Sequence, residues 1–403
     1  MKEFITMGRS GCTMSKKVII IGAGIGGLFT AISLIEKGFQ VKVYEKATQF
    51  GNVGAGIVLG ANAIHALGTL RLDKLVKAHG AKVGTAEIRN WDGSVIFELP
   101  TRKQADRYGT HSYLIKRSTL LAILLEQLDT QPIISLNKNL HKISQNQNNV
   151  TAYFTDGTYD EADILIGADG INSIVREQLF GERELRYSGY TAFRGICDMV
   201  EPSHPLEDGG GFEVWGKGKR FGYSYLGDGK VYWFAAINSQ AGKRIDREER
   251  KEIVRKYFET CYPPVQQTIE VTESSSILHH DIFDLKPLKQ WSQGRITLLG
   301  DAAHPMLPNL GQGGAQAMED AIVLTHVLQN NSSVEEALLV YENTRKRRTQ
   351  TVVNQSRKMG RLVQLESSIL MIGRNTFLKY VPKEMLTTQL DWVLGYKVDR
   401  ELQ

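Results

Sequence analysis

The sequence predicts an α/β fold, in which a parallel sheet covered by helices is interrupted by an antiparallel sheet and followed by a helical C-terminal region. Two observations lead to this prediction. The apolar run Val18–Ile21 passes through a glycine turn and a helical pattern into a second apolar run, Val41–Tyr44. Such a unit is typical of parallel strands buried on both faces. Between about 187 and 285 the pattern changes to alternating aromatic strands separated by Gly- and Asp-containing turns, which indicates an antiparallel sheet.

The first turn carries the pattern Gly22-x-Gly24-x-x-Gly27, and a helix is predicted over Leu28–Lys37. Glycines at this spacing allow a tight turn, close backbone approach to a pyrophosphate, and close packing of helix on strand. Glu45 follows the second strand at the distance where an acidic residue meets ribose hydroxyls. The segment therefore predicts a Rossmann-like dinucleotide site. Glu rather than Arg at this position favours FAD or NAD over NADP.

Two further elements are predicted next along the chain. A helix is expected from about 117 to 129, opening at Arg117. The apolar strand Ala162–Ile166 leads into Asp169, before a helix over Ile171–Leu179. Asp169 has two interpretations, because a carboxylate at this point can contact a cofactor or simply cap the helix that follows.

The inserted sheet is expected to contain the strands Phe221–Tyr225 and Lys230–Ile237. One helix is predicted near 246–260, ended by Pro263 and Pro264. Proline lacks the backbone N–H that a continuing helix needs, which is the basis for that boundary.

The last α/β segment begins with the strand Ile296–Leu299 and ends in Asp301. A turn containing Pro305 and Pro308 follows, and a helix opens at Gly311–Gly314. A carboxylate beside a glycine-rich helix start suits a phosphorylated, hydroxyl-bearing cofactor, because the free N–H groups and the helix dipole favour negative charge. An ordinary strand–turn–helix is the alternative.

The changes of pattern divide the chain into five predicted segments. They are a disordered extension at 1–14, a first cofactor-domain part at 15–186, a β-rich substrate domain at 187–285, a second cofactor-domain part at 286–360, and a helical segment at 361–403.

Composition narrows the function classes. The net charge of +5, from 49 Lys and Arg against 44 Asp and Glu, is mild for 403 residues. The basic run Arg345–Arg348 lies in a mixed-charge helical segment, which favours a solvated helix face over a nucleic-acid surface. The three cysteines are widely separated and form no CxxC pair, which argues against a disulfide framework and fits a cytoplasmic location. We expect no metal site, because the adjacent His279 and His280 would point to opposite faces of a strand.

No apolar run is long enough to span a bilayer, and residues 1–14 lack the hydrophobic core of a signal peptide. We therefore expect no stable membrane insertion. For residues 361–403, packing against the main body is favoured over membrane contact.

Three motifs stand in a fixed order: GAGIGG at 22–27, LIGADGINSIVR at 165–176, and LLGDAAHPMLPNLGQGGAQAMEDA at 298–321. This arrangement resembles the FAD-dependent aromatic hydroxylases, the group A flavoprotein monooxygenases, from residue 17 to about 350. The resemblance implies a Rossmann-like FAD-binding domain with NAD(P)H as co-substrate and no second Rossmann domain for it. It also implies that O₂ is used to hydroxylate a substrate through a flavin C4a-hydroperoxide.

The resemblance assigns expected cofactor contacts. Asp301 would hold the ribityl chain, the helix start from Gly311 to Ala315 would lie under the flavin ring, and Arg117 would lie beside the flavin. Asp169 and the following glycine match a motif tied to FAD and to transient NAD(P)H contact. The full expected set is Gly22, Gly24, Gly26, Gly27, Glu45, Lys46, Val58, Arg117, Leu140, Asp169, Asp301, Gly311, Gly313, Gly314 and Ala315.

Within the family, GQGGAQAMEDA with HPMLP, and SGYTAFRG at 188–195, resemble the branch acting on salicylate, urate and zeaxanthin. Arg220 and Tyr232 are spaced like an arginine and a tyrosine of bacterial FAD-dependent urate hydroxylases, and with Pro305 they form the expected catalytic set. Thr191–Arg194 departs from the asparagine-bearing stretch of those enzymes. Ordinary packing is the alternative for Arg220 and Tyr232, and a structural turn is the alternative for Pro305.

These expectations support three hypotheses. The first is a monooxygenase that hydroxylates a small aromatic or heteroaromatic compound, acting as a monomer or homodimer. The second applies the same flavin chemistry to a polyene, polyketide or antibiotic, by epoxidation or inactivating hydroxylation. The third is a non-catalytic binding protein that keeps the FAD fold only as a scaffold. The cradle formed by Asp301 and Gly311–Gly314 weighs against the third.

Overall fold

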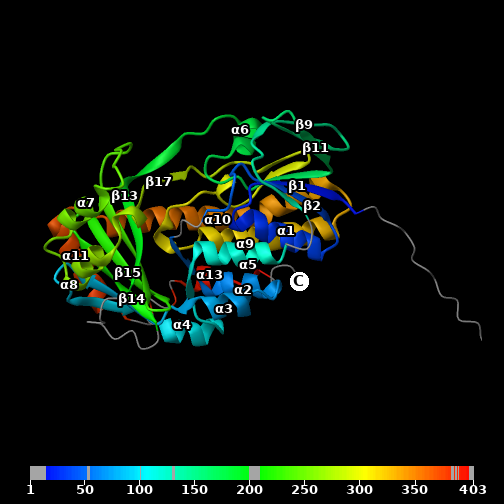
Figure 1. Cartoon of the computed structure of the whole chain (residues 1–403). Coiled ribbons are helices and arrows are strands. Elements are labelled where there is room, and N and C mark those ends of the chain that lie inside the picture. Colours follow the sequence, from blue (N-terminus) through cyan, green and yellow to red (C-terminus); the bar gives the residue numbers. More distant parts are fainter. Residues whose placement is uncertain are drawn as a thin grey trace, which may run out of the picture.

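The computed structural model describes residues 15–398, except 52–54, 100, 129–131, 199–208, 383–384, 386–387 and 389. Two large sheets organise these residues, one at each end of the molecule (Figure 1). The predicted extension at 1–14 lies outside the described residues.

The first sheet has six strands and is parallel except at one edge. Its order is β18 (Ser292–Gln293), β19 (Ile296–Leu298), β12 (Ile164–Gly167), β1 (Lys17–Ile21), β2 (Gln40–Tyr44) and β8 (Ile134–Ser135). The strands β19 and β1 are nearly 280 residues apart along the sequence, yet each pairs with β12 in parallel register. The carboxyl ends of these strands therefore meet at one edge, which is where ligands bind in open α/β sheets.

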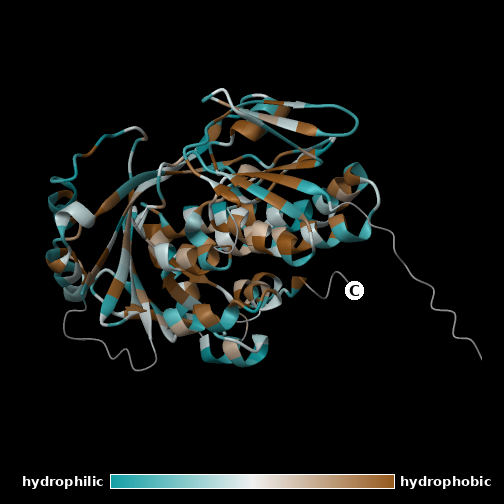
Figure 2. Cartoon of the chain, turned by 45° about the vertical axis from the view of Figure 1, so that its right-hand side comes forward, coloured by the Kyte–Doolittle hydropathy of each residue, from teal (hydrophilic) through white to brown (hydrophobic). Residues whose placement is uncertain are grey.

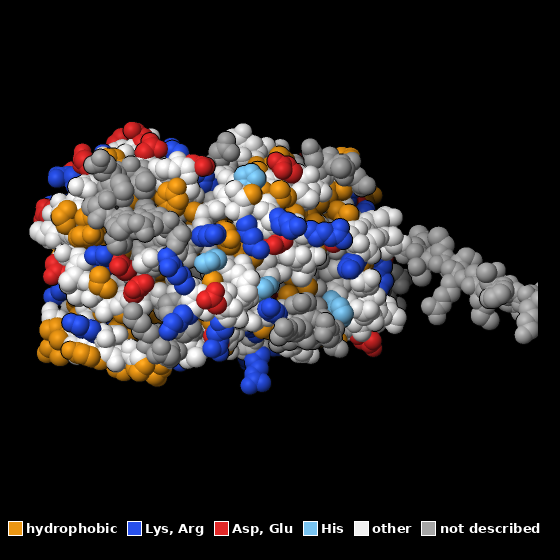
Figure 3. Space-filling view, turned by 90° about the horizontal axis from the view of Figure 1, so that it is seen from below, with side chains coloured by type: hydrophobic (Ala, Val, Ile, Leu, Met, Phe, Trp, Pro, Cys, Tyr) orange, Lys and Arg blue, Asp and Glu red, His pale blue; other side chains and the backbone are white. Residues whose placement is uncertain are grey.

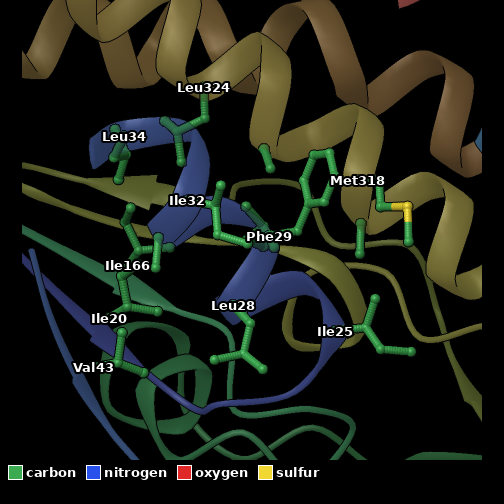
Figure 4. Close-up of a cluster of buried hydrophobic side chains, with 14 of the residues drawn as sticks. Ile20, Ile25, Leu28, Phe29, Ile32, Leu34, Val43, Ile166, Met318 and Leu324 are labelled. Carbon is green, nitrogen blue, oxygen red and sulfur yellow. The ribbon is translucent and has the colours of Figure 1, made fainter. Parts of the chain in front are cut away.

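The core lies between this sheet and two helices, α1 (Ile25–Glu36) and α9 (Gly313–Asn330), which pack against each other. Figure 4 shows side chains of three neighbouring strands meeting side chains of both helices. The buried residues in this view include Ile20, Val43, Ile166, Leu28, Phe29, Ile32, Met318 and Leu324. Apolar segments also concentrate here when the chain is coloured by hydropathy (Figure 2).

The second sheet has seven strands: β17 (Leu278–Leu285), β13 (Leu185–Asp198), β16 (Lys230–Asn238), β15 (Lys219–Gly227), β14 (Gly210–Gly216), β5 (Thr85–Asn90) and β6 (Val95–Leu99). Neighbours are antiparallel except β14 and β5, which are parallel. Strands β5 and β6 thus join this sheet from far upstream in the sequence. The fold class predicted from the sequence is confirmed, and the added parallel pair was not anticipated.

Alternation along β16 gives this sheet two different faces. Val231, Trp233 and Ala235 point to one face and pack against α7 (Arg250–Tyr257) and α8 (Pro263–Val271). Tyr232 and Phe234 point to the other face, which the register shares with Arg194 of β13 and Arg220 of β15.

Two three-stranded sheets and several helices connect the large sheets. One small sheet is β11 (Tyr159–Ala162), β10 (Val150–Phe154) and β9 (Leu140–Gln145), and the other is β3 (Gly56–Leu59), β7 (Tyr113–Lys116) and β4 (Ala81–Lys82). The helices are α2 (Ala61–Thr69), α3 (Asp73–His79), α4 (Thr101–Tyr108), α5 (Arg117–Glu126), α6 (Ile174–Phe180), α10 (Val334–Val363), α11 (Ser368–Tyr380) and α13 (Asp391–Leu394).

The helix α10 runs along α9 and joins the two ends of the molecule (Figure 1). At its far end α11 packs inward through Arg374, whose guanidinium lies 4.4 Å from the ring of Trp215. The outer side of α11 is apolar and exposed, with Ile369 at 82% and Tyr380 at 76%. Hydrophobic side chains gather at the same end of the face drawn in Figure 3. None of the described helices combines the length and the apolar composition that a membrane crossing requires.

The helix predicted near 246–260 is present as α7 and ends before Pro263 and Pro264, as expected. The second helix, α8, was not predicted, and the two prolines occupy its first positions. The physical reason is that the first turn of a helix has no intrahelical partner for its N–H groups, so proline is well tolerated there.

Candidate active site

The glycine turn after β1 is shaped by close backbone contacts. Gly22 has φ +105°, and its N–H donates to the carbonyl of Tyr44 at 2.8 Å. A Cβ on Gly27 would overlap the carbonyl oxygen of Gly22, and one on Gly26 would lie 3.0 Å from the side chain of Leu299. A Cβ on Gly24 would meet nothing within 4 Å. The turn is therefore tight on its inner side and open at Gly24, as backbone approach to a pyrophosphate requires.

A cavity of about 190 Å³ opens beside this turn at the carboxyl ends of the parallel strands. Residues from four separate segments line it, and they include Gly22, Gly24, Glu45, Lys46, Leu140 and Asp169. The structure thus brings together six of the residues predicted to contact the cofactor.

Glu45 is held in place by the backbone. Its Oε2 accepts from the N–H of Ala23 at 2.8 Å and its Oε1 from the N–H of Ala47 at 2.9 Å. Each carboxylate oxygen has two lone pairs, so both can still accept hydrogen bonds from ribose hydroxyls. The site therefore fits the adenosine part of FAD.

Asp169 lines the same cavity and also caps α6. Its Oδ1 accepts from the hydroxyl of Ser173 at 2.6 Å, and its Oδ2 accepts from the N–H of Ile174 at 2.8 Å. Burial raises the pKa of this carboxyl, while these hydrogen bonds oppose the rise. The capping role considered from the sequence is present, and it positions Asp169 at the cavity wall.

Asp301 lies in the short turn that follows β19, at the same edge of the parallel sheet. Its carboxylate has accessible surface, and within the described part of the chain no group donates a hydrogen bond to it. Desolvation by the surrounding protein raises its pKa, and the nearby His304 and Arg117 oppose the rise. An exposed carboxylate with free acceptor positions is suited to receive hydroxyl groups of a ligand.

The start of α9 lies next to Asp301 and has no side-chain cap. Gly311 takes the left-handed conformation with φ +62°, which reverses the chain just before the helix. The first turn, Gly313 to Ala315, contains no acidic residue. Its N–H groups and the positive end of the helix dipole are therefore available to a ligand that carries negative charge.

A buried network of charged and polar side chains connects α9 to α2 and α10. Glu319 of α9 pairs with Arg345 at 2.8 Å and Arg348 at 2.7 Å, and it accepts from Asn62 of α2 at 2.7 Å. Asp320 pairs with Arg345 at 2.7 Å. The basic run at 345–348 was expected to be a solvated helix face. That expectation is wrong for Arg345, which is fully buried, because its charge is matched by two carboxylates.

His304 belongs to the same network. Its Nε2 lies 2.6 Å from Oδ2 of Asp320, and the side chain is buried. Burial alone would raise the pKa of Asp320, but His304 and Arg345 outweigh that effect and hold the pKa below its usual range. His304 is therefore a structural hydrogen-bonding residue.

The guanidinium group of Arg220 forms hydrogen bonds with other side chains of the protein. It is 5% exposed, and its guanidinium donates to Glu213 at 3.0 Å and to Oδ1 of Asn309 at 2.5 Å. The same Asn309 oxygen accepts from the hydroxyl of Tyr190 at 3.1 Å. The ordinary-packing alternative thus describes Arg220 well, and its Nε is the part that lacks a partner among the described residues.

Tyr232 lies on the same face of the sheet as Arg220. Burial raises the pKa of its phenol, while the guanidinium groups of Arg194 and Arg220 lower it. A Cβ on Gly56 of β3 would lie 2.7 Å from the Tyr232 ring, so the ring packs directly on that strand. Tyr232 and Arg194 therefore form a polar pair on the face that looks toward β3.

Sequence reasoning missed Asn309 and Glu213. Asn309 lies in the turn between Asp301 and α9, and its side chain links that turn to Arg220 and, through Nδ2, to the carbonyl of Ser356 in α10 at 3.0 Å. The position of Asn309 within the segment HPMLPNLGQGG, between Asp301 and the helix start, could have indicated that it belongs to the site. Pro305 is buried in the same turn, and Pro308 is exposed and begins a short 3-10 helix at 308–310.

A second cavity, of about 130 Å³, lies between the seven-stranded sheet and β3. Val58, predicted as a cofactor contact, forms part of its wall, and a Cβ on Gly311 would lie 3.7 Å from the Cβ of Val58. The cavity thus begins beside the start of α9. His279 and His280 point to opposite faces of β17, and the described residues contain no cluster of His, Cys, Asp or Glu able to hold a metal.

Fold and site together define a flavoprotein. A glycine turn and a glutamate with free acceptor positions lie at one end of the site, and a carboxylate beside an uncapped helix start lies at the other. Comparison with known proteins agrees. The profile of the family described as "FAD binding domain" matches residues 15–356. The chain belongs to this family, in the group of FAD-dependent aromatic hydroxylases, and it is an FAD-dependent monooxygenase.

Individual relatives span nearly the whole chain. An aurachin C monooxygenase/isomerase of Stigmatella aurantiaca is 36% identical, over 91% of this chain and 94% of the relative. A 2-heptyl-3-hydroxy-4(1H)-quinolone synthase of Pseudomonas aeruginosa is 33% identical over 91% of this chain and 94% of the relative. The crystal structure of Klebsiella pneumoniae HpxO complexed with FAD and uric acid superposes with a TM-score of 0.89, at 28% identity, covering 95% of this chain and 96% of that one.

Proposed function

We propose that the protein uses FAD, NAD(P)H and O₂ to hydroxylate a small aromatic or heteroaromatic compound. The observation that carries the proposal is the junction at Asn309. This residue lies in the turn between Asp301 and the uncapped start of α9, and it bonds to Arg220 in the seven-stranded sheet at 2.5 Å. A flavin ring at that helix start would therefore face the Tyr232 side of the sheet.

Bound FAD supplies the hydride-accepting and O₂-activating chemistry of the reaction. The protein supplies position and electrostatics. The N–H groups at the start of α9 stabilise negative charge on the bound ring system, because they are preorganised in a site that excludes water. Asp301 accepts hydrogen bonds from cofactor hydroxyls, and Glu45 does so at the adenosine end.

The substrate ring would lie between the start of α9 and the sheet. Tyr232 and Arg194 would hold a ring oxygen or nitrogen, since one can accept or donate a hydrogen bond and the other carries a permanent positive charge. Apolar neighbours such as Phe234 keep water from this side of the site.

The relatives indicate two kinds of heteroaromatic substrate. HpxO was crystallised with uric acid, a polar purine, whereas the Pseudomonas enzyme is named for a quinolone that carries a heptyl chain. Both kinds are compatible with the proposed reaction, so a screen should contain purines, aromatic acids and alkylquinolones.

The test begins with the purified protein, which should be yellow and release FAD on denaturation. NADH or NADPH oxidation is then measured with each compound, and products are examined by mass spectrometry under isotopically labelled O₂. The expected result is oxidation stimulated by at least one compound, with one labelled oxygen atom in the product. A protein that cannot be loaded with FAD, or that yields only peroxide with every compound, would contradict the proposal.

A further inference from the structure

We infer that the 130 Å³ cavity beside the start of α9 receives an apolar chain on the substrate, so that the substrate is an aromatic ring with an uncharged alkyl or prenyl substituent. This inference rests on the proposed function and narrows it. It takes the cavity as a continuation of the ring site, because the wall residue Val58 lies next to Gly311.

The lining of the cavity is mainly apolar. Ile88 and Leu99 contribute from the β5–β6 pair, Leu114 from β7, and Phe234 from β16. These side chains come from strands far apart in the sequence, and they converge around an open space where a compact core would normally be filled.

Three glycines, Gly210, Gly211 and Gly222, contribute backbone to the cavity wall. A Cβ on Gly222 would overlap the ring of Phe234, and a Cβ on Gly211 would overlap the carbonyl oxygen of Tyr223. The ring of Phe234 therefore lies directly on Gly222 and forms part of the apolar wall, while the backbone of the neighbouring strand closes the sheet at Gly211. Glycine at these two positions allows that close approach.

The acidic groups at the cavity are already paired. Glu213 accepts from Arg220 at 3.0 Å and from Nε1 of Trp215 at 2.7 Å, and Glu87 accepts from Nε of Arg89 at 2.8 Å. A substrate carboxylate in the cavity would face these carboxylates, and the one lysine of the wall, Lys82, is exposed at the rim. An uncharged chain meets no such penalty.

The size of the cavity sets the length of the chain. A cavity of about 130 Å³ has room for on the order of ten non-hydrogen atoms, since one water molecule needs roughly 10 to 15 Å³. A chain of about seven carbons fits within that limit, whereas a polar purine would leave the cavity to water.

The experiment uses the FAD-loaded enzyme and 4(1H)-quinolones with 2-alkyl chains from methyl to nonyl, with uric acid and salicylate as chainless rings. Binding is measured from the change in the flavin absorption spectrum, and turnover from coupled NAD(P)H oxidation. The dissociation constant should fall about three- to four-fold for each added methylene until the cavity is filled. Chainless rings should bind more weakly by at least about 100-fold than the heptyl compound.

Two variants test the location. Ala86→Phe places a ring in the cavity wall and should abolish the chain-length dependence while a methyl-substituted quinolone still binds normally. Leu99→Ala enlarges the cavity and should move the optimum to a longer chain. Val95→Phe, at an exposed position of the neighbouring strand β6, is the matched control and should change neither. FAD content and thermal unfolding show that each variant is folded.

The outcomes separate the two proposals. Tight binding and coupled hydroxylation of chainless rings, with no gain from added methylenes, would overturn the apolar-chain inference and leave the proposed function intact. A chain-length dependence that survives Ala86→Phe would overturn the assignment to this cavity. Failure of every ring compound to perturb the flavin or stimulate NAD(P)H oxidation would contradict both.

Discussion

Asp301→Asn should weaken FAD binding and, at neutral pH, stabilise the FAD-free protein. The carboxylate has no hydrogen-bond donor within the described part of the chain, and desolvation raises its pKa. When the pKa of an acid is higher in the folded state than in the unfolded state, its ionisation destabilises the folded state. This loss of stability begins as the pH rises past the unfolded-state pKa and is complete above the folded-state pKa. Asparagine removes this charge, so the free energy of unfolding should rise at neutral pH and stay unchanged at a pH below both values.

The magnitude for FAD follows from the interaction that is lost. A hydrogen bond to a charged group contributes about 1.5 to 3 kcal/mol. Since about 1.4 kcal/mol corresponds to a factor of ten, the dissociation constant for FAD should rise roughly 10- to 150-fold.

The assay combines two measurements on protein stripped of its flavin. FAD affinity is obtained by titration calorimetry, and stability by thermal unfolding across the acidic to neutral range. Asp228→Asn is the matched control, because Asp228 is exposed in a turn with φ +51°, a conformation that asparagine also tolerates. An FAD dissociation constant within about twofold of the parent would refute the role given to Asp301, and a loss of stability at neutral pH would refute the electrostatic reasoning.

Three further substitutions test other parts of the site. Gly27→Ala would force a Cβ onto the carbonyl oxygen of Gly22, so it should cost about 1 to 3 kcal/mol or more and lower FAD content; a parent-like melting temperature and flavin spectrum would contradict this. Asn309→Ala removes the acceptor for Arg220 and Tyr190, so the free energy of unfolding, measured with denaturant, should fall by about 2 to 4 kcal/mol. A fall of less than about 0.5 kcal/mol would be incompatible with these hydrogen bonds. Asp320→Asn breaks a buried ion pair and should cost about 3 to 5 kcal/mol at neutral pH. Because the pKa of Asp320 is lowered, its stabilisation exists above the unfolded pKa and is lost as pH falls through the folded pKa, so a deficit that does not shrink in acid would argue against it.

The parts of the molecule that sequence could predict depend on local pattern. The turn from Gly22 to Gly27 and the acidic Glu45 follow from spacing within one β-α-β unit, so their positions at the cavity were foreseeable. The strand that ends at Asp301 and the helix that starts near Gly311 were recognisable for the same reason. The groups that contact these residues in the folded protein come from distant parts of the chain, so the local pattern could not predict them.

The partners of Arg220 and Arg345 are examples of contacts that the sequence pattern could not predict. The basic residue Arg345 looked like a surface charge, because its two carboxylate partners lie on a different helix, about 25 residues earlier in the chain. For Arg220, a catalytic role and ordinary packing both stayed open, because Glu213 and Asn309 meet it only after the sheet and the turn are assembled. Periodicity identifies elements, whereas charge pairing across elements is decided by tertiary packing.

The single side chain of Asn309 couples three parts of the structure: the turn before α9, the seven-stranded sheet through Arg220, and α10 through Ser356. A transplanted sheet from a relative with another substrate would arrive without partners for this amide. Exchange of substrate specificity by recombination should therefore succeed only when the crossover carries the sheet, the turn and the matching stretch of α10 as one inherited block. The residues that such an exchange must carry together are discontinuous in sequence and compact in space.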